Sequence, residues 1–272
     1  MSAILIGDYD WGILKPNEID SEKARDFFLA VLEKEQTLTF GYEKIVSQQP
    51  GLVRTLTKYC NESFLKHHKL DFRMEALINI AVNAAKHQKE QSGADVLIAG
   101  VLGPIRNNGG DLQDFELERI FSEPVIYQLD RGVESLLIEG FSDFHQWEVA
   151  LKTVRKVNSV PVPIAAFLKI KAPFDLNLLQ DALHLYDQLE IELLGFEIEI
   201  RELGDLIEVK KLKCSGFGLM LHSENHAELS VAELDLVSKQ ILEFGPTLLL
   251  GGAGLSSIDW QKIKDRLKKR KE

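Results

Sequence analysis

Eight short apolar runs, each bounded by turn residues, recur along the whole chain and constrain its fold more than any other feature. They lie at residues 3–7, 51–57, 95–101, 135–141, 162–168, 193–200, 216–221 and 247–252. Most are apolar nearly throughout, which is typical of parallel strands covered on both faces. Helical patterns at 21–35, 74–91, 143–157, 175–189, 230–245 and 256–269 lie between them. This alternation predicts an α/β fold, a single (β/α)8 TIM barrel, with a doubly wound open sheet as the main alternative.

The chain is expected to be one domain, spanning residues 1–272. No Pro-, Gly- or Ser-rich linker divides it, and α/β barrels commonly use this length as one unit. No G-x-G-x-x-G follows the first strand, which argues against a dinucleotide site of that type. Residues 103–119, "GPIRNNGGDLQDFELER", are predicted to form a long loop over the barrel mouth, with Gly109 and Gly110 favouring mobility.

Charge and composition exclude several classes of partner. The net charge of −10 disfavours a nucleic-acid partner, because phosphate contacts need clustered Lys and Arg. No stretch approaches the roughly 20 apolar residues of a membrane helix, so no membrane is expected as a partner. The two cysteines, Cys60 and Cys214, form neither a metal-ligand spacing nor a disulfide framework, and the N-terminus does not look like a secretory signal. We therefore expect a cytoplasmic protein with a small-molecule ligand; the oligomeric state stays open.

The carboxyl ends of the strands are where a barrel places its site, so polar and glycine residues there are the candidate ligand-binding residues. The candidates are Asp8, Thr55, Glu139, Glu197, His222, Gly251 and Gly252. Asp8 and Glu139, at the ends of the first and fourth strands, either contact a ligand or accept hydrogen bonds from neighbouring backbone amides. The histidine, with the glutamates, could form an oxygen-rich metal site or simply be a hydrogen-bonded loop residue. The glycine pair permits either close approach of a ligand or a tight turn.

Five motifs at successive strand ends, "GDYDWG", "TLTKY", "AGVLGP", "GVESLLIEGFSD" and "GGAGLSSIDWQKI", together resemble those of the homocysteine S-methyltransferase family. The matching residues are Asp8, Gly12, Thr55, Thr57, Ala99, Gly100, Gly103, Pro104, Gly132, Val133, Ile138, Glu139, Ser142, Asp143, Gly251 and Gly252. The resemblance spans the whole chain in the same order. It implies a TIM barrel, and it implies that Asp8 and Glu139 stand where the family grips the amino-acid part of its substrate.

The sequence departs from the family at the zinc ligands. The family is expected to hold a catalytic zinc through three cysteines, one in G-x-N-C on strand six and two in G-G-C-C on strand eight, and thereby to activate a substrate thiol as thiolate. Here Glu197 and Ile198 stand in place of the Asn and Cys. Ala253 replaces one cysteine of the pair, and the other is either absent or replaced by Gly254. By this alignment neither cysteine of the chain reaches these positions, so we expect no metal and no cofactor. If Ile198 replaces an inward ligand, alternation directs Glu197 away, towards the helices.

Three functions are compatible with these residues. The first is a divergent homocysteine S-methyltransferase-like barrel that has lost zinc chemistry and binds a small amino-acid-like ligand through Asp8 and Glu139. The second is an active methyltransferase that transfers a methyl group to a thiol without the usual zinc site. The third is an enzyme of another class that uses carboxylates and His222 in the same cup. We favour the first function, and the catalytic residues are left unassigned.

Overall fold

The computed structural model describes residues 5–9, 22–34, 36–105, 112–211, 216–224 and 228–269. Gly109, Gly110 and Cys214 therefore lie outside the described residues, as does the side chain of Asp8. The strands are β1 (Leu5–Tyr9), β2 (Leu52–Arg54), β3 (Leu97–Leu102), β4 (Ser135–Phe141), β5 (Ile164–Lys169), β6 (Leu193–Glu199), β7 (Phe217–His222) and β8 (Leu248–Gly251). Each coincides with one of the apolar runs, apart from small shifts at its ends.

All strand pairs are parallel, and they follow the order of the chain from β1 to β8. Strand β1 pairs with β2 through Gly7 and Leu52, and also with β8, where Leu5 lies opposite Leu248. A Cβ on Gly7 would lie 2.3 Å from a side-chain atom of Leu250, so the glycine lets β1 and β8 pack closely. The predicted α/β class with parallel strands is confirmed.

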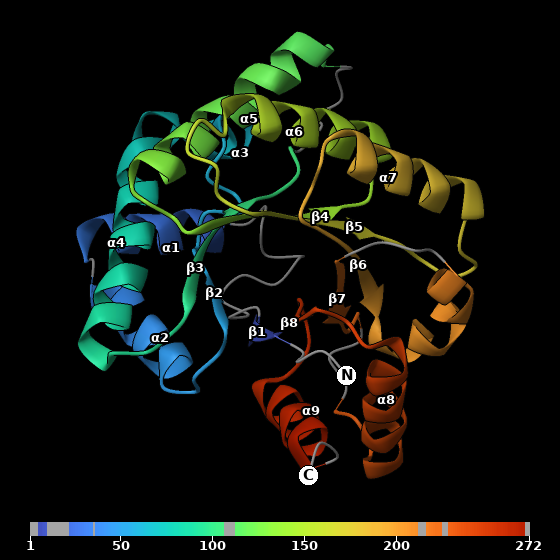
Figure 1. Ribbon diagram of the computed structural model, residues 1–272. Coiled ribbons are helices and arrows are strands. Elements are labelled where there is room, and N and C mark those ends of the chain that lie inside the picture. The colour runs from blue at the N-terminus through green and yellow to red at the C-terminus, as the bar shows by residue number, and fades with distance from the viewer. Residues whose placement is uncertain are drawn as a thin grey trace.

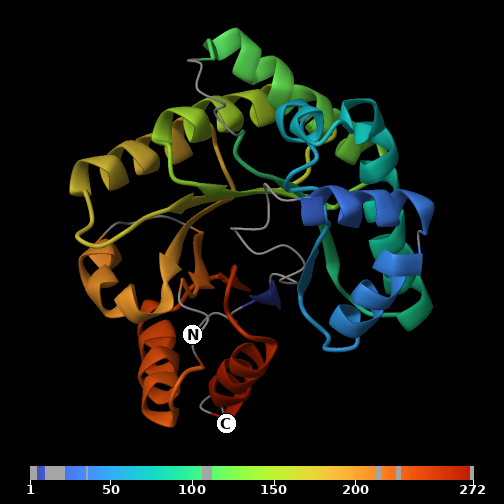
Figure 2. The same cartoon turned by 180° about the vertical axis from the view of Figure 1, so that it is seen from behind.

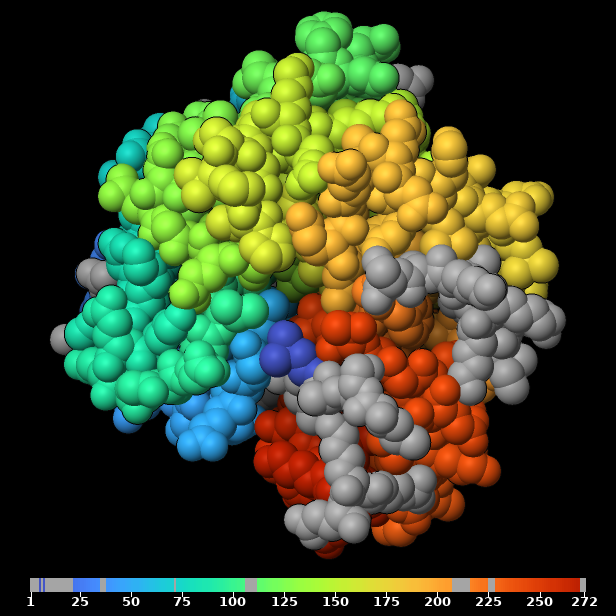
Figure 3. All heavy atoms as spheres, in the orientation of Figure 1, coloured from blue at the N-terminus to red at the C-terminus, as the bar shows by residue number. Residues whose placement is uncertain are grey.

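Helices cover the outside of the strands (Figures 1 and 2). The α-helices are α1 (Glu22–Glu33), α2 (Gln36–Val46), α3 (Glu62–His67), α4 (Met74–Ser92), α5 (Asp114–Asp130), α6 (Phe144–Val157), α7 (Leu176–Gln188), α8 (Val231–Phe244) and α9 (Ser257–Lys269). Two 3-10 helices, η1 (Asp71–Arg73) and η2 (Ile200–Lys211), complete the described elements. In the space-filling view, β1 is a small blue patch near the centre, and α8 and α9 form the red flank beside it (Figure 3). None of the described helices is both long and apolar enough to cross a membrane.

Two separate apolar clusters show which way the strand side chains face. The larger cluster joins the helices to strand residues such as Val53, Ile98 and Leu249. The smaller cluster contains only strand residues, which alternate with those of the larger cluster and so lie on the inner face: Leu52, Ala99, Val101, Leu137, Phe167, Met220, Leu248 and Leu250. The alternation places the next residues towards the carboxyl ends, Arg54, Glu139 and Lys169, on this inner face as well.

Local signals set the helix ends. The carboxylate of Asp143 accepts a hydrogen bond from the amide of Gln146 and begins α6. A capping box of Ser230 and Glu233 begins α8, and Gly245, with φ of 61°, ends it.

The prediction of a loop over 103–119 is wrong in its second half, because α5 begins at Asp114. A capping box begins this helix. The Glu116 carboxylate accepts a hydrogen bond from the amide of Gln113, and the Gln113 side chain accepts one from the amide of Glu116. Two other helices, α2 and α3, are likewise absent from the sequence-based prediction. Residues 106–111 of the expected loop lie outside the described residues.

Candidate active site

A buried cluster of three charged side chains joins the carboxyl ends of β2, β4 and β8. Arg54 donates from Nη1 to Oε2 of Glu139 at 3.1 Å and from Nη2 to the carbonyl oxygen of Gly251 at 2.6 Å. Lys58 Nζ lies 3.0 Å from the other carboxylate oxygen of Glu139. Arg54 and Glu139 are 6% and 3% exposed, so both charges are removed from water. The cluster thus holds Glu139 between two cations, and we name these three residues the ionic cluster.

Two glycines provide the space in which Lys58 lies. A Cβ on Gly103 would be 2.7 Å from both Cγ and the carbonyl oxygen of Lys58, and a Cβ on Gly140 would be 2.9 Å from its Cε. The amide of Gly103 also donates to the Lys58 carbonyl at 3.1 Å. Gly140 has a φ of 85°, a conformation that side chains other than glycine rarely adopt. The backbones of β3 and β4 therefore position the lysine against Glu139.

Burial of Glu139 acts to raise the pKa of its carboxyl group, but the positive charges of Lys58 and Arg54 outweigh burial and hold that pKa below its ordinary value. Glu139 is consequently an anion at neutral pH. The negative charge of Glu139 is already balanced by Arg54 and Lys58, so it attracts the ammonium group of a ligand only weakly. Glu139 alone therefore does not make the mouth selective for ammonium groups.

The hydroxyl groups of Thr55 and Thr57 bind protein groups that tie β2 to β3. The two hydroxyl oxygens are 2.9 Å apart, and Thr55 donates to the carbonyl oxygen of Ala99 at 3.1 Å. The hydroxyl oxygen of Thr57 accepts a hydrogen bond from the amide of Val101 at 3.0 Å. The same hydroxyl lies 3.0 Å from Oε1 of Gln128. These contacts position the end of β2, from which the ionic cluster extends.

The outward orientation of Glu197, expected if Ile198 replaces an inward ligand, is wrong. Ile198 belongs to the larger apolar cluster, between the sheet and the helices. Glu197 pairs in register with Lys169 on β5 and with Met220 on β7, and Met220 lies in the inner cluster. Because inward and outward residues alternate along β6, Glu197 faces inwards and is only 5% exposed. Ile198 therefore does not occupy an inward ligand position.

His222, the last residue of β7, lies beside a glutamate on β6. Its Nδ1 is 3.6 Å from Oε2 of Glu199, and its side chain is 3% exposed. Burial first, and then the positive charge of Lys169, lowers the pKa of His222 from 6.5 to about 4. The ring is therefore neutral at pH 7.

The glycine-rich segment after β8 forms a tight connection to β7 and then turns. The amide of Gly252 donates to the carbonyl oxygen of Leu221 at 2.6 Å, and the carbonyl oxygen of Ala253 accepts from the amide of Ser223 at 3.0 Å. A Cβ on Gly252 would lie 3.1 Å from the Leu221 carbonyl. Gly254, with φ of 77°, makes the turn towards α9. Close backbone approach thus explains the glycines without a ligand.

The described residues do not fit the zinc ion that the sequence resemblance implies. Among them, no group of three His, Cys, Asp or Glu side chains could hold a metal ion. Cys60 is buried near Leu56, whose carbonyl oxygen lies 3.7 Å from Sγ, and burial raises the pKa of its thiol to about 12. The guanidinium of Arg54 binds the carbonyl oxygen of Gly251, two residues before Ala253, the first of the two expected ligand positions. A cation there disfavours a second one.

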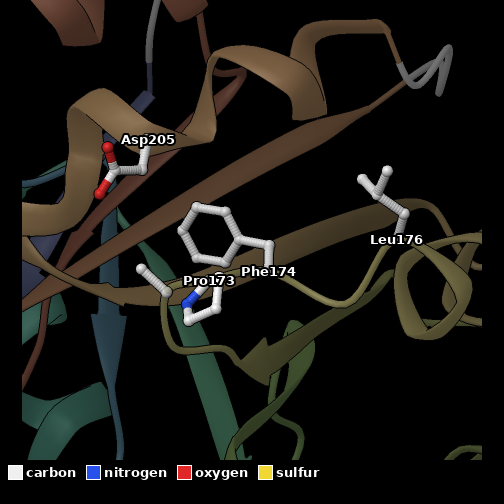
Figure 4. A pocket seen from close by; sticks show the side chains of 5 residues that line it. Pro173, Phe174, Leu176 and Asp205 are labelled. Carbon is white, nitrogen blue, oxygen red and sulfur yellow. The ribbon is translucent and has the colours of Figure 1, made fainter.

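A separate pocket of about 540 Å³ opens beside the segment that joins β5 to α7. Ala172, Pro173, Phe174 and Leu176 form its apolar wall, and Asp205 extends from η2 (Figure 4). Both lining segments follow the carboxyl ends of neighbouring strands. The pocket therefore opens on the same end of the sheet as the ionic cluster.

Sequence reasoning placed Glu139, Glu197 and His222 at the strand ends, where the structure also has them. It missed the cations Arg54 and Lys58. The available signal was a pair of basic residues flanking the two threonines in "RTLTK", one inside an otherwise apolar strand. The backbone of Asp8 lies in β1, but its contacts lie outside what the structure describes, so its role as a ligand contact stays a prediction.

Comparisons with known proteins agree on the family and the fold. Residues 21–196 match the family described as homocysteine S-methyltransferase, which is more than half of the chain. The match ends at Phe196, directly before Glu197 and Ile198. No curated protein sequence matches the chain.

Solved structures are similar to the chain in fold. The chain is similar to the homocysteine methyltransferase MmuM from Escherichia coli, in its metallated form (TM-score 0.75) and its oxidized form (TM-score 0.76), at 17% identity and covering 97% of this chain and 96% of that one. It is also similar to a GH18 chitinase from Pseudoalteromonas aurantia, with a TM-score of 0.54, 11% identity and coverage of 98% and 99%. At such identities the likeness shows the fold alone, and the same architecture hosts unrelated activities.

Proposed function

This chain belongs to the homocysteine S-methyltransferase family, and we propose that it is a divergent member, a complete (β/α)8 barrel that binds a small amino-acid-like ligand at its mouth without zinc. The pairing of β1 with both β2 and β8 supports the complete barrel. The low cysteine content supports a reducing, cytoplasmic setting.

The position of Arg54 is the observation that supports a mouth without zinc. Its guanidinium bridges the Glu139 carboxylate and the Gly251 carbonyl, at the tip of the strand that should lead into the thiolate pair. A buried guanidinium needs such partners, because an unpaired buried charge is costly. The arrangement is stable by itself and does not require a metal to neutralise it.

The charges at the strand ends favour a ligand that has both signs. Cationic side chains reach the inner face from β2 and β5 through Arg54 and Lys169, and carboxylates reach it from β4 and β6 through Glu139 and Glu197. Lys58 is the most accessible member of the ionic cluster, with an 18% exposed side chain. An amino acid is a zwitterion, so its carboxylate can approach the lysines while its ammonium approaches a glutamate.

Thermal unfolding in the presence of candidate ligands tests the proposal. We expect L-methionine, L-homocysteine or S-methylmethionine to raise the melting temperature, because a ligand at 100 times its Kd stabilises a protein by about 2.7 kcal/mol. Lys58→Met should reduce the shift, and Glu148→Gln, which changes an exposed pair with Lys152, should not. If none of the three compounds shifts the transition at millimolar concentration, the proposed ligand class is wrong.

Metal analysis tests the other half of the proposal. We expect the purified protein, and the protein dialysed against equimolar zinc, to retain far less than one zinc per chain. Stoichiometric zinc that survives dialysis would overturn the proposal and would favour an active methyltransferase whose metal is held by other residues.

A further inference from the structure

Glu199 and His222 form a second layer of polar residues on the inner face, above the apolar interior. Met220 lies in the inner cluster and pairs in register with Glu197. Two residues further along each strand, His222 pairs with Glu199. Because side chains two residues apart share a face, both point inwards at the carboxyl end of the sheet.

The carboxylate of Glu199 is fixed so that it faces one nitrogen of the imidazole ring. Its Oε2 accepts a hydrogen bond from the amide of Glu224 at 2.6 Å and lies 3.6 Å from Nδ1 of His222. The guanidinium of Arg201 is 3.9 Å from the other carboxylate oxygen. Gly252 packs on the far side, where an added Cβ would be 3.1 Å from Cβ of His222. The ring is thus held between β6 and β8.

The other ring nitrogen has no partner within the part of the chain that the structure describes. Nε2 of His222 is buried and makes no hydrogen bond to any described residue. Buried polar atoms in proteins nearly always have a hydrogen-bond partner, and a buried polar atom without one destabilises the fold. A buried ring nitrogen of this kind, at the carboxyl end of the sheet, is therefore suited to a hydrogen bond with a group that a ligand supplies.

Burial, and then the surrounding charges, lower the pKa of this ring and keep it neutral. Lys169 on β5, Lys171 after it and Lys58 after β2 all disfavour the imidazolium, and the carboxylate of Glu224 favours it. Burial and the three cations prevail. A neutral ring carries one hydrogen, and the negative charge of Glu199, 3.6 Å from Nδ1, favours that hydrogen on Nδ1.

We propose that Glu199 is a positioning residue that holds His222 as the Nδ1–H tautomer, so that Nε2 accepts a hydrogen bond from an N–H or O–H group of the ligand. The proposal rests on the proposed function for the identity of the ligand. It narrows the ligand class to molecules that present a donor at this layer, and an amino-acid ammonium is such a group. An apolar or purely anionic ligand leaves Nε2 without a partner.

Nuclear magnetic resonance of 15N-histidine-labelled protein tests the tautomer without any ligand. The two-bond couplings of the ring should show Nδ1 protonated and Nε2 unprotonated at pH 7, and His222→Phe assigns the signal among the seven histidines. Glu199→Gln should shift the ring towards the Nε2–H tautomer. The matched control Glu224→Gln keeps the amide that binds Glu199 and should leave the tautomer unchanged. An Nε2–H tautomer or an imidazolium in the unaltered protein would overturn the proposal.

Calorimetry with paired ligands tests the acceptor role. L-methionine should bind His222→Phe about tenfold more weakly than the unaltered protein, while 4-(methylthio)butanoate, which lacks the ammonium, should bind both about equally. Equal losses for the two compounds would show that the ring acts only through packing and would refute the acceptor role. If neither compound binds the unaltered protein, the proposed ligand class fails, and the tautomer measurement still decides whether Nε2 is an acceptor.

Discussion

Replacement of Glu139 by Gln should destabilise the protein strongly, because it removes the anion from between two cations. Arg54 Nη1 and Lys58 Nζ lie 3.1 Å and 3.0 Å from the Glu139 carboxylate. Breaking a buried ion pair costs about 3–5 kcal/mol, mainly because the remaining charge stays buried. Since Lys58 can turn towards water, we place the cost of Glu139→Gln near the lower end, at about 3 kcal/mol. Lys58→Met, which leaves the Arg54 pair intact, should cost about 1 kcal/mol.

Urea unfolding at pH 7 measures the difference, with Glu148→Gln as the surface control, which should change stability by less than about 0.5 kcal/mol. The pKa of Glu139 is lower in the folded protein than in the unfolded chain. Its contribution is therefore present above the unfolded pKa and is lost as the pH falls through the folded pKa. The gap between the unaltered protein and Glu139→Gln should stay constant from pH 7 to pH 5 and narrow only in strong acid. A loss below about 1 kcal/mol at pH 7 would refute the assignment of a buried, mutually dependent cluster.

Three further results are expected. Gly140→Ala should lower the free energy of unfolding in urea by about 2–3 kcal/mol, because it adds a close contact with Lys58 to the strain of a positive φ. Gly93→Ala, at a glycine with a positive φ and open space around it, should cost about 1 kcal/mol. Equal losses in the two variants would contradict the idea that Gly140 provides the space for Lys58. The free energy of unfolding of the unaltered protein should fall by up to about 3 kcal/mol as the pH falls from 6.5 to 4, because His222 binds a proton in the unfolded chain but, with a pKa of about 4, does not in the folded protein. This loss of stability should be smaller in His222→Phe. An identical pH profile of stability in the two proteins would contradict the lowered pKa. In a Cys214→Ser background, Cys60 should react with a thiol reagent only on unfolding, because its pKa is about 12; rapid reaction of the folded protein would show that the thiol is accessible.

The strands could be predicted from the sequence because each is a short apolar run that needs cover on both faces, and that pattern does not depend on distant residues. Helix α5 could not, because signals within it conflict. Residues before it are rich in Gly and Asn, and Pro124 lies inside the helix, where its ring removes a backbone donor. Packing against α6 and β3 outweighs this local preference.

The chemistry of the mouth was predictable only in part. Carboxylates at strand ends were visible as exceptions in apolar runs, so Glu139 and Glu197 were found. The side of the sheet that Glu197 faces was not predicted, because the family alignment placed Ile198 inwards. The pairing of Gly195 with Phe167, a residue of the inner cluster, sets the alternation along β6 and directs Glu197 inwards. Arg54 and its carboxylate partner are 85 residues apart, and only the folded sheet brings them together.

The bond between the Arg54 guanidinium and the Gly251 carbonyl has a consequence for synthesis of the chain. Its two ends are separated by 197 residues, so the acceptor leaves the ribosome long after the donor. Until β8 has been synthesised, β1 has no strand partner on one side, and the Arg54 guanidinium lacks the Gly251 carbonyl oxygen as a hydrogen-bond acceptor. A nascent chain stalled before β8 therefore contains most of its helices and no finished mouth, and it should be a preferred substrate for chaperones and proteases.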